Sequence, residues 1–186
     1  MPPIMQAIRA ALAARGRART DRDAASDSAA VHVHQELQVA ALPEHVFELV
    51  RDIEWLPAWN PHLEMRHVSG PLERVGTTFE ATLKMLGLQF QGTGSVVEAE
   101  PGRLVHLRVD CTGAHGGTSD WIYRFAPEVG NTRCSVDLGC AESGGAMLVM
   151  LDRVFGRPAL TRALERIAGQ QLENLAALGE RRVPHG

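Results

Sequence analysis

The fold is decided by residues 77–94, which read TTFEATLKMLGLQFQGTG. Up to Met85 apolar and polar side chains alternate, which is the pattern of a strand with one buried face. Residues 86–87, Leu-Gly, then suit the two-residue turn that closes a hairpin. Such a turn places Leu83 opposite Phe90, so that apolar side chains face each other. The segment therefore predicts an antiparallel hairpin with one apolar and one polar face.

The same alternation continues along the chain after this hairpin. Residues 100–103, Glu-Pro-Gly-Arg, have proline and glycine where a tight turn favours them. Three further strands then place one apolar set on the same face: Val105, Leu107, Val109, Trp121, Tyr123, Phe125, Cys134, Val136 and Leu138. With a first strand from Val31, this predicts a curved antiparallel sheet of about seven strands with one solvated side.

Helical patterns occur in only two places within this region. Pro43 opens a short helix, and a second helical or turn segment carries Trp55 and Trp59. The long candidate is residues 145–178, in which Pro158 should break the helix just before itself. Its apolar stripe is Leu160, Leu164, Ile167, Leu175 and Leu178. We predict an α+β fold in which the sheet wraps around this C-terminal helix, with two short helices after the first strand.

Composition limits the classes of function. The chain has 186 residues, 45% of them hydrophobic, which suits one domain with a core of its own. The net charge of −3 gives no basic field for nucleic acid. No apolar run reaches the length of a membrane span, and no secretory signal is recognised. The three cysteines are read as small buried hydrophobes in a reducing compartment, so we expect a cytoplasmic protein.

Three parts of the chain are predicted. Residues 1–30 are read as an amphipathic segment followed by a flexible linker, residues 31–180 as the domain, and residues 181–186 as a tail. Arginines beside the apolar positions of the N-terminal segment would suit an anionic membrane surface. A frayed tail with solvated arginines is the reading we favour.

Five short motifs carry a family resemblance: residues 41–47 (ALPEHVF), 59–61 (WNP), 76–79 (GTTF), 100–103 (EPGR) and 131–133 (NTR). On these the chain resembles the START-like superfamily, also called SRPBCC, and within it the bacterial polyketide cyclase/dehydrase and lipid-transport group. The resemblance implies a helix-grip fold with a hydrophobic cavity between sheet and last helix, which relatives use for lipids, sterols, polyketides or other apolar ligands. It supplies no catalytic residue for any position here.

The apolar face defines the residues expected to bind a ligand: Trp59, Phe79, Leu83, Phe90, Leu107, Trp121, Tyr123 and Val136, closed by Met147 and Leu151. Ligand pockets are often apolar with a few polar groups. The Tyr123 hydroxyl, the Trp121 indole, His67, Ser119 and Glu98 are the polar groups expected near this face. Tyr123 and His67 are weak candidates for catalysis. For Trp59 we favour a second role, that of an anchor tying the short helices to the sheet. Residues 147–151 are a gate or, as we favour, a static plug.

Most other titratable groups are predicted to lie on the outer face of the sheet. His32 and His34 alternate with Val31 and Val33, which puts them on the polar side and argues against a metal site. The same alternation makes a solvated charge cluster of His106, Arg108, Asp110, Asp120 and Arg124. Gly92 and Gly94 are read as marks of sharp sheet curvature or of space for the helix, and not as a nucleotide site. We therefore predict no metal and no cofactor.

Three functions follow as hypotheses. The leading one is binding or carriage of a hydrophobic small molecule, lipid or polyketide-like. The second is an enzyme, a polyketide cyclase or dehydratase that uses the same cavity. The third is a module for protein or membrane interaction. A cavity of several hundred Å³ would suit a ligand, whereas a filled interior would leave only the third hypothesis. Ligand identity and oligomeric state do not follow from the sequence.

Overall fold

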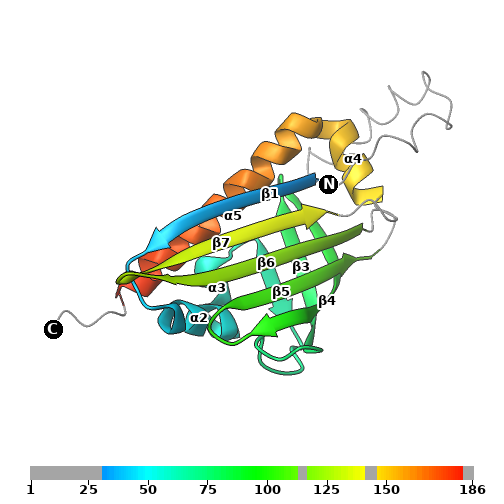
Figure 1. Ribbon diagram of the computed structural model, residues 1–186. Coiled ribbons are helices and arrows are strands. Elements are labelled where there is room, and N and C mark those ends of the chain that lie inside the picture. Colours follow the sequence, from blue (N-terminus) through cyan, green and yellow to red (C-terminus); the bar gives the residue numbers. More distant parts are fainter. Residues whose placement is uncertain (1–30, 113–116, 141–145, 182–186) are drawn as a thin grey trace, which may run out of the picture.

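The structure is a computed structural model that describes residues 31–112, 117–140 and 146–181. A single antiparallel sheet of seven strands forms most of it. The strand order is β1-β7-β6-β5-β4-β3-β2. The strands are β1 (Val31–Val39), β2 (Leu63–Arg66), β3 (Thr78–Met85), β4 (Leu88–Glu100), β5 (Leu104–Cys111), β6 (Gly117–Glu128) and β7 (Asn131–Cys140). The predicted curved sheet is confirmed (Figure 1).

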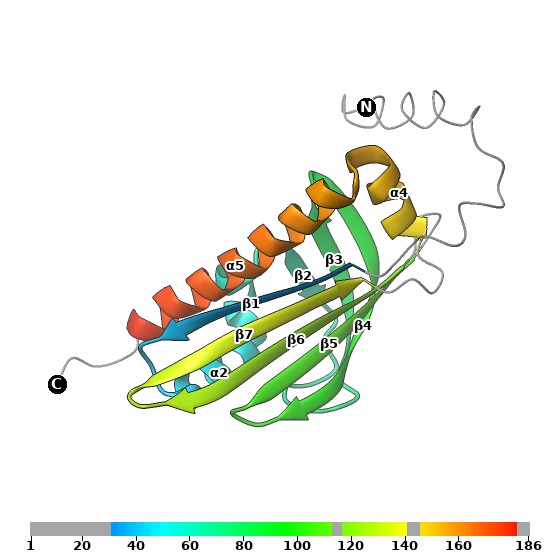
Figure 2. The ribbon, with the colours of Figure 1, turned by 45° about the horizontal axis from the view of Figure 1, so that its top comes forward.

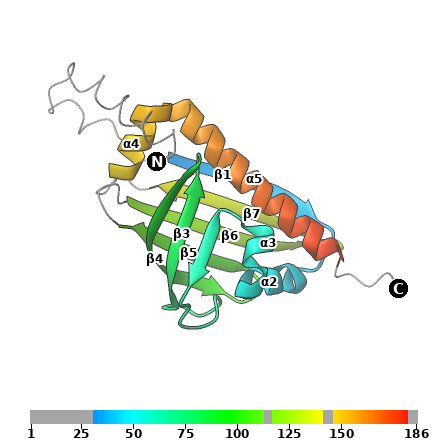
Figure 3. The ribbon, with the colours of Figure 1, turned by 180° about the vertical axis from the view of Figure 1, so that it is seen from behind.

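The helices follow the predicted order. After β1 come α2 (Pro43–Arg51), the 3-10 turn η1 (Ile53–Trp55) and α3 (Leu56–Trp59), and the chain ends with α4 (Ala146–Phe155) and α5 (Arg157–Arg181). Helix α5 crosses the inner side of the sheet, as Figures 2 and 3 show from two directions. Helices α2 and α3 lie at one end of α5, and α4 lies at the other. This is the predicted helix-grip arrangement.

The β3–β4 hairpin has the predicted register. Leu83 pairs with Phe90, and Met85 pairs with Leu88. The turn residues Leu86 and Gly87 have φ angles of 54° and 75°. Positive φ at both central positions is what the turn that matches the twist of a hairpin requires. The apolar faces of both strands therefore point inward.

The predicted C-terminal helix is broken at Gly156. This glycine has a φ of 81°, and its N–H donates to the Asp152 carbonyl oxygen at 2.8 Å. Left-handed backbone ends an α-helix at little cost when the residue is glycine. Pro158 then falls in the first turn of α5, where its missing N–H costs no hydrogen bond. The break thus lies just before Pro158, as predicted, and α5 continues past residue 178 to Arg181.

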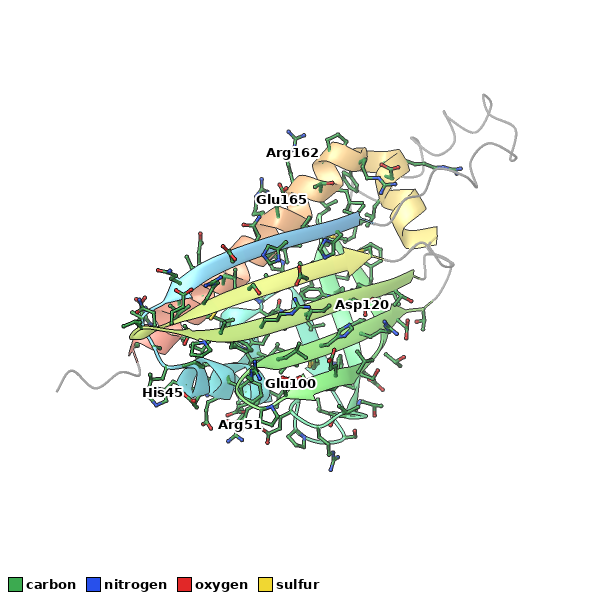
Figure 4. The ribbon with its side chains drawn as sticks, in the orientation of Figure 1. His45, Arg51, Glu100, Asp120, Arg162 and Glu165 are labelled. Atoms are coloured by element: carbon green, nitrogen blue, oxygen red, sulfur yellow. The ribbon has the colours of Figure 1, made fainter. Side chains whose placement is uncertain are left out.

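The outer face of the sheet carries the charged pairs. His106 Nε2 and Arg108 Nε each lie within 3 Å of Asp120 Oδ1, and His34 Nδ1 lies 2.8 Å from Asp137 Oδ1. Figure 4 shows Asp120 on this outer side, away from α5. The residues that alternate with these charges, among them Val33 and Leu107, are buried. The sequence assigned these residues to the correct faces.

All three cysteines are free and buried. Burial raises the pKa of the Cys134 thiol to about 12, and the pKa of Cys111 and of Cys140 to about 11. The thiols therefore stay protonated at neutral pH and pack as small hydrophobes, as expected. Within the described residues no helix is both long and apolar enough to cross a membrane. The predicted N-terminal segment and nearly all of the predicted tail lie outside the described residues.

Candidate functional site

A small cavity lies between one end of the sheet and the first half of α5. Its volume is about 20 Å³, which is room for a single water molecule. The wall is formed by His62, Leu83, Lys84, Met85, Ser119, Trp121, Leu138, Gly139, Cys140, Leu164 and Ile167. The volume is far below the several hundred Å³ that a preformed ligand pocket would have. Side chains of α5 and of the strand ends therefore fill most of the predicted pocket.

Only two of the predicted ligand-binding residues, Leu83 and Trp121, line this cavity. Leu151 is fully buried in α4, and the side chain of Met147 lies outside the described part of the chain. The other predicted residues pack as core: Trp59, Phe79, Phe90, Leu107, Tyr123 and Val136 are all buried and do not line the cavity. Alternation identified the inner face but not which part of it α5 covers.

Ser119 and Trp121 place a pair of polar groups on the cavity wall. Both come from β6, two residues apart, so they share the inner face. The Trp121 indole Nε1–H donates to Ser119 Oγ at 3.0 Å. The exposed fractions of the two residues are 4% and 6%. The expectation that Ser119 faces the interior is confirmed.

His62 is the one ionisable ring on the cavity wall. Its Nδ1 lies 3.2 Å from the Lys84 carbonyl oxygen and its Nε2 lies 3.0 Å from Gln170 Oε1. Since a carbonyl only accepts, Nδ1 carries the proton and Nε2 holds the lone pair in the neutral ring. The terminal amide of Gln170 can turn to donate to it. The Lys84 ammonium instead pairs with Glu64 at 3.3 Å and is half-exposed.

Three buried side chains in the core form a closed ring of hydrogen bonds, called here the polar ring. Asn60 Nδ2 donates to the Tyr123 hydroxyl at 3.3 Å, the Tyr123 hydroxyl donates to Gln171 Oε1 at 3.0 Å, and Gln171 Nε2 donates to Asn60 Oδ1 at 3.1 Å. All three residues are fully buried. Burial raises the pKa of Tyr123 well above its usual range, against a smaller opposing effect of the Asn60 hydrogen bond. The Tyr123 hydroxyl is thus held by protein groups on both sides.

Trp59 packs against this ring. Its indole meets the Tyr123 ring edge-on, with ring centroids 5.2 Å apart. Its carbonyl oxygen accepts from Asn174 Nδ2 of α5 at 3.4 Å. Trp59 Nε1 is buried without a hydrogen-bond partner among the described residues. This position fits the anchoring alternative, because Trp59 ties α3 to both β6 and α5.

Two other predicted polar groups point away from the interior. The His67 side chain is 77% exposed and pairs with Glu80 at 2.9 Å. Glu98 is also exposed, since the β4 register shifts between Val96 and Glu98. A bulge of this kind reverses the faces that simple alternation assigns. Neither residue faces the cavity, which removes the basis for a role of His67 there.

Sequence reasoning gave no role to His62, Asn60 or Gln171. For Gln171 a signal existed: it lies four residues after Ile167 and four before Leu175, inside the apolar stripe of the long helix. A polar residue at a core position demands a partner. Asn60 was quoted within the Trp-Asn-Pro motif, but its partners lie 63 and 111 residues away along the chain. No local pattern contains such distances.

Many solved structures are similar to this chain, including the following three. The Zhui aromatase/cyclase from Streptomyces sp. R1128 has a TM-score of 0.65 and 19% identity, over 84% of this chain and 98% of that one. A protein from Chromobacterium violaceum has a TM-score of 0.60 and 18% identity, over 81% and 97% of the two chains. The di-domain ARO/CYC StfQ from the steffimycin biosynthetic pathway has a TM-score of 0.60 and 18% identity, over 83% and 52%. At these identities the likeness shows a shared fold.

The family follows from the sequence. The family model described as polyketide cyclase / dehydrase and lipid transport matches residues 30–180, so the chain belongs to this family. A comparison with curated protein sequences gives no match. Membership supports ligand binding or a cyclase reaction in general terms and assigns neither to this chain.

Proposed function

We propose that this protein binds a hydrophobic small molecule at the cavity between the sheet and α5. The observation that carries the proposal is the cavity wall, which is mostly carbon from Leu83, Met85, Leu138, Leu164 and Ile167 with a few placed polar groups. That composition is typical of ligand sites. The wall belongs to a domain whose family description includes lipid transport.

The cavity must enlarge when a ligand enters, because it now holds one water at most. Helix α4 is the element best placed to move. It joins α5 through Gly156 in a left-handed conformation, and its residues Met150 and Leu151 are buried. A displacement of α4 about Gly156 would expose apolar surface that the ligand then covers. The gate, which the sequence left as the lesser alternative to a plug, is therefore part of the proposal.

Bound molecules are the first test. We expect organic extraction of the purified protein, followed by mass spectrometry, to release an apolar compound, and we expect the emptied protein to bind naphthalene-type probes. Ile167→Ala removes a cavity wall and should raise the affinity for such a probe. Leu175→Ala is the matched control, because Leu175 is also a buried residue of α5 and does not line the cavity. Both variants should lose about 2 to 5 kcal/mol of stability.

Titration of probe fluorescence measures these affinities. Equal affinities of the two variants would place the probe elsewhere. Protein that is empty on extraction and indifferent to every apolar probe would overturn the proposal in favour of an interaction module.

A cyclase is the second candidate, and His62 is the observation that favours it. The Lys84 carbonyl fixes the imidazole tautomer, which leaves Nε2 to take or return a proton, as in sites where a base is held by a third group. Two of the similar structures are aromatase/cyclases by name. The earlier candidate Tyr123 is less suited, since both partners of its hydroxyl are protein amides.

Turnover of a reactive poly-β-carbonyl chain tests this second candidate. We expect His62→Asn, whose amide can still donate to the Lys84 carbonyl, to lower kcat about 100-fold or more. Tyr123→Phe should retain turnover. If wild-type protein and His62→Asn cyclise the chain equally, His62 has no part in the chemistry.

A further inference from the structure

We propose that the ligand of the cavity carries a neutral carbonyl group, and that the Ser119 hydroxyl donates a hydrogen bond to its oxygen. The inference rests on the proposed function, because it names the class of molecule that the same cavity binds. The observation behind it is the Trp121–Ser119 pair on an otherwise apolar wall.

The position of Ser119 is set by the sheet. In the ladder it lies opposite Val109 of β5 and Cys140 of β7, so its side chain is flanked by inward-facing neighbours. It is 4% exposed, yet it lines the cavity. A buried hydroxyl on an apolar wall is costly unless its hydrogen bonds are satisfied. The hydrogen bonds that Ser119 can still form therefore indicate which kind of ligand group would fit beside it.

The Ser119 hydroxyl still has a hydrogen atom available to donate. Serine offers one O–H donor and two acceptor lone pairs. Trp121 Nε1–H occupies one lone pair, and within the described residues no acceptor takes the hydroxyl hydrogen. Donation by the indole polarises the hydroxyl and strengthens it as a donor in turn. The pair thus presents a hydrogen-bond donor, which calls for an acceptor on the ligand.

The surrounding groups favour a neutral acceptor over a carboxylate. The ammonium of Lys84 is engaged with Glu64 outside the cavity, and Nδ1–H of His62 donates to a backbone carbonyl. The Cys140 thiol, also on the wall, has a pKa raised to about 11 by burial and stays neutral. An anion would lose its hydration here and gain only one hydrogen bond. A ketone or ester oxygen needs no more than that.

Two probes of matched shape test the inference: 2-acetylnaphthalene and 2-isopropenylnaphthalene, in which a CH₂ group replaces the carbonyl oxygen. We expect Ser119→Ala to weaken binding of the ketone about fivefold, the size of one net hydrogen bond. Binding of the hydrocarbon should change less than twofold. Thr118→Val is the control, because Thr118 is the neighbouring residue on β6 and its hydroxyl bonds to Asp110 on the outer face.

A second variant keeps the test valid if Ser119→Ala lowers the stability of the protein. Ser119→Ala leaves the buried Trp121 indole without an acceptor, whereas the double variant Ser119→Ala/Trp121→Phe removes both polar groups together. The double variant should show the same loss of preference for the ketone. In the wild-type complex the infrared carbonyl stretch should lie at lower wavenumber than in either variant complex.

The outcomes separate the two proposals. Binding of both probes with equal effects of Ser119→Ala on each, or an unshifted carbonyl stretch, would overturn the carbonyl assignment and leave the binding function standing. Failure of both probes to bind the emptied wild-type protein would overturn the two together.

Discussion

Asn60→Ala should lower the free energy of unfolding by about 3 kcal/mol. The change removes a side chain that is fully buried and that bonds to two other side chains and one backbone N–H. Gln171 Nε2 and the His62 backbone N–H lose their shared acceptor, and the Tyr123 hydroxyl loses its donor. Each buried polar group left without a partner costs free energy, because water cannot reach it to form a replacement hydrogen bond.

Urea unfolding followed by circular dichroism measures this effect. Gln170→Ala is the control, because Gln170 lies beside Gln171 on α5 but is exposed. We expect it to change stability by no more than about 0.5 kcal/mol. Similar losses for the two variants would show that the polar ring does not stabilise the core.

Gly94→Ala should destabilise the protein by about 3 kcal/mol, because a Cβ at this position would lie 2.1 Å from Cε2 of Phe79. Phe79 is 3% exposed and pairs directly with Gly94 in the β3–β4 ladder. The ring crosses the space that a side chain on β4 would occupy. One of the two residues must therefore be small.

A double-mutant cycle tests this reciprocity. Phe79→Leu shortens the ring partner, so Gly94→Ala should cost less in the Phe79→Leu background, with a coupling of about 1 to 2 kcal/mol. Gly92→Ala is the contrasting variant, since its Cβ would meet the Asp110 backbone oxygen of β5 at 2.2 Å. Phe79→Leu should not relieve that clash. Equal behaviour of the two glycines in the cycle would contradict the assigned contact.

Gly92 and Gly94 also show what sequence patterns can and cannot predict. Their occurrence inside a strand predicted curvature, and the structure explains it by close approach of Phe79 at Gly94 and of the β5 backbone at Gly92. The hairpin pairing and the break near Pro158 were predicted because turn residues and a missing backbone N–H act on their immediate neighbours. Glu98 was misplaced because a single extra residue in β4 reversed the alternation.

The candidate site was likewise predictable in part. Alternation along the strands determined which residues point inward, and it correctly placed Trp121, Ser119 and the outer charged cluster. It could not show that α5 fills most of the pocket, since how deeply Leu164 and Ile167 enter depends on the crossing of a helix over a curved sheet. Nor could it show that Asn60, Tyr123 and Gln171 meet.

Sequence by itself thus determined the fold class, the register of the β3–β4 hairpin and most of the inner face, because local periodicity and turn chemistry encode them. The size of the cavity, the closed polar ring and the orientation of His62 were decided only by tertiary structure. They arise from contacts between residues 22 to 111 positions apart, which packing brings together and no local pattern records.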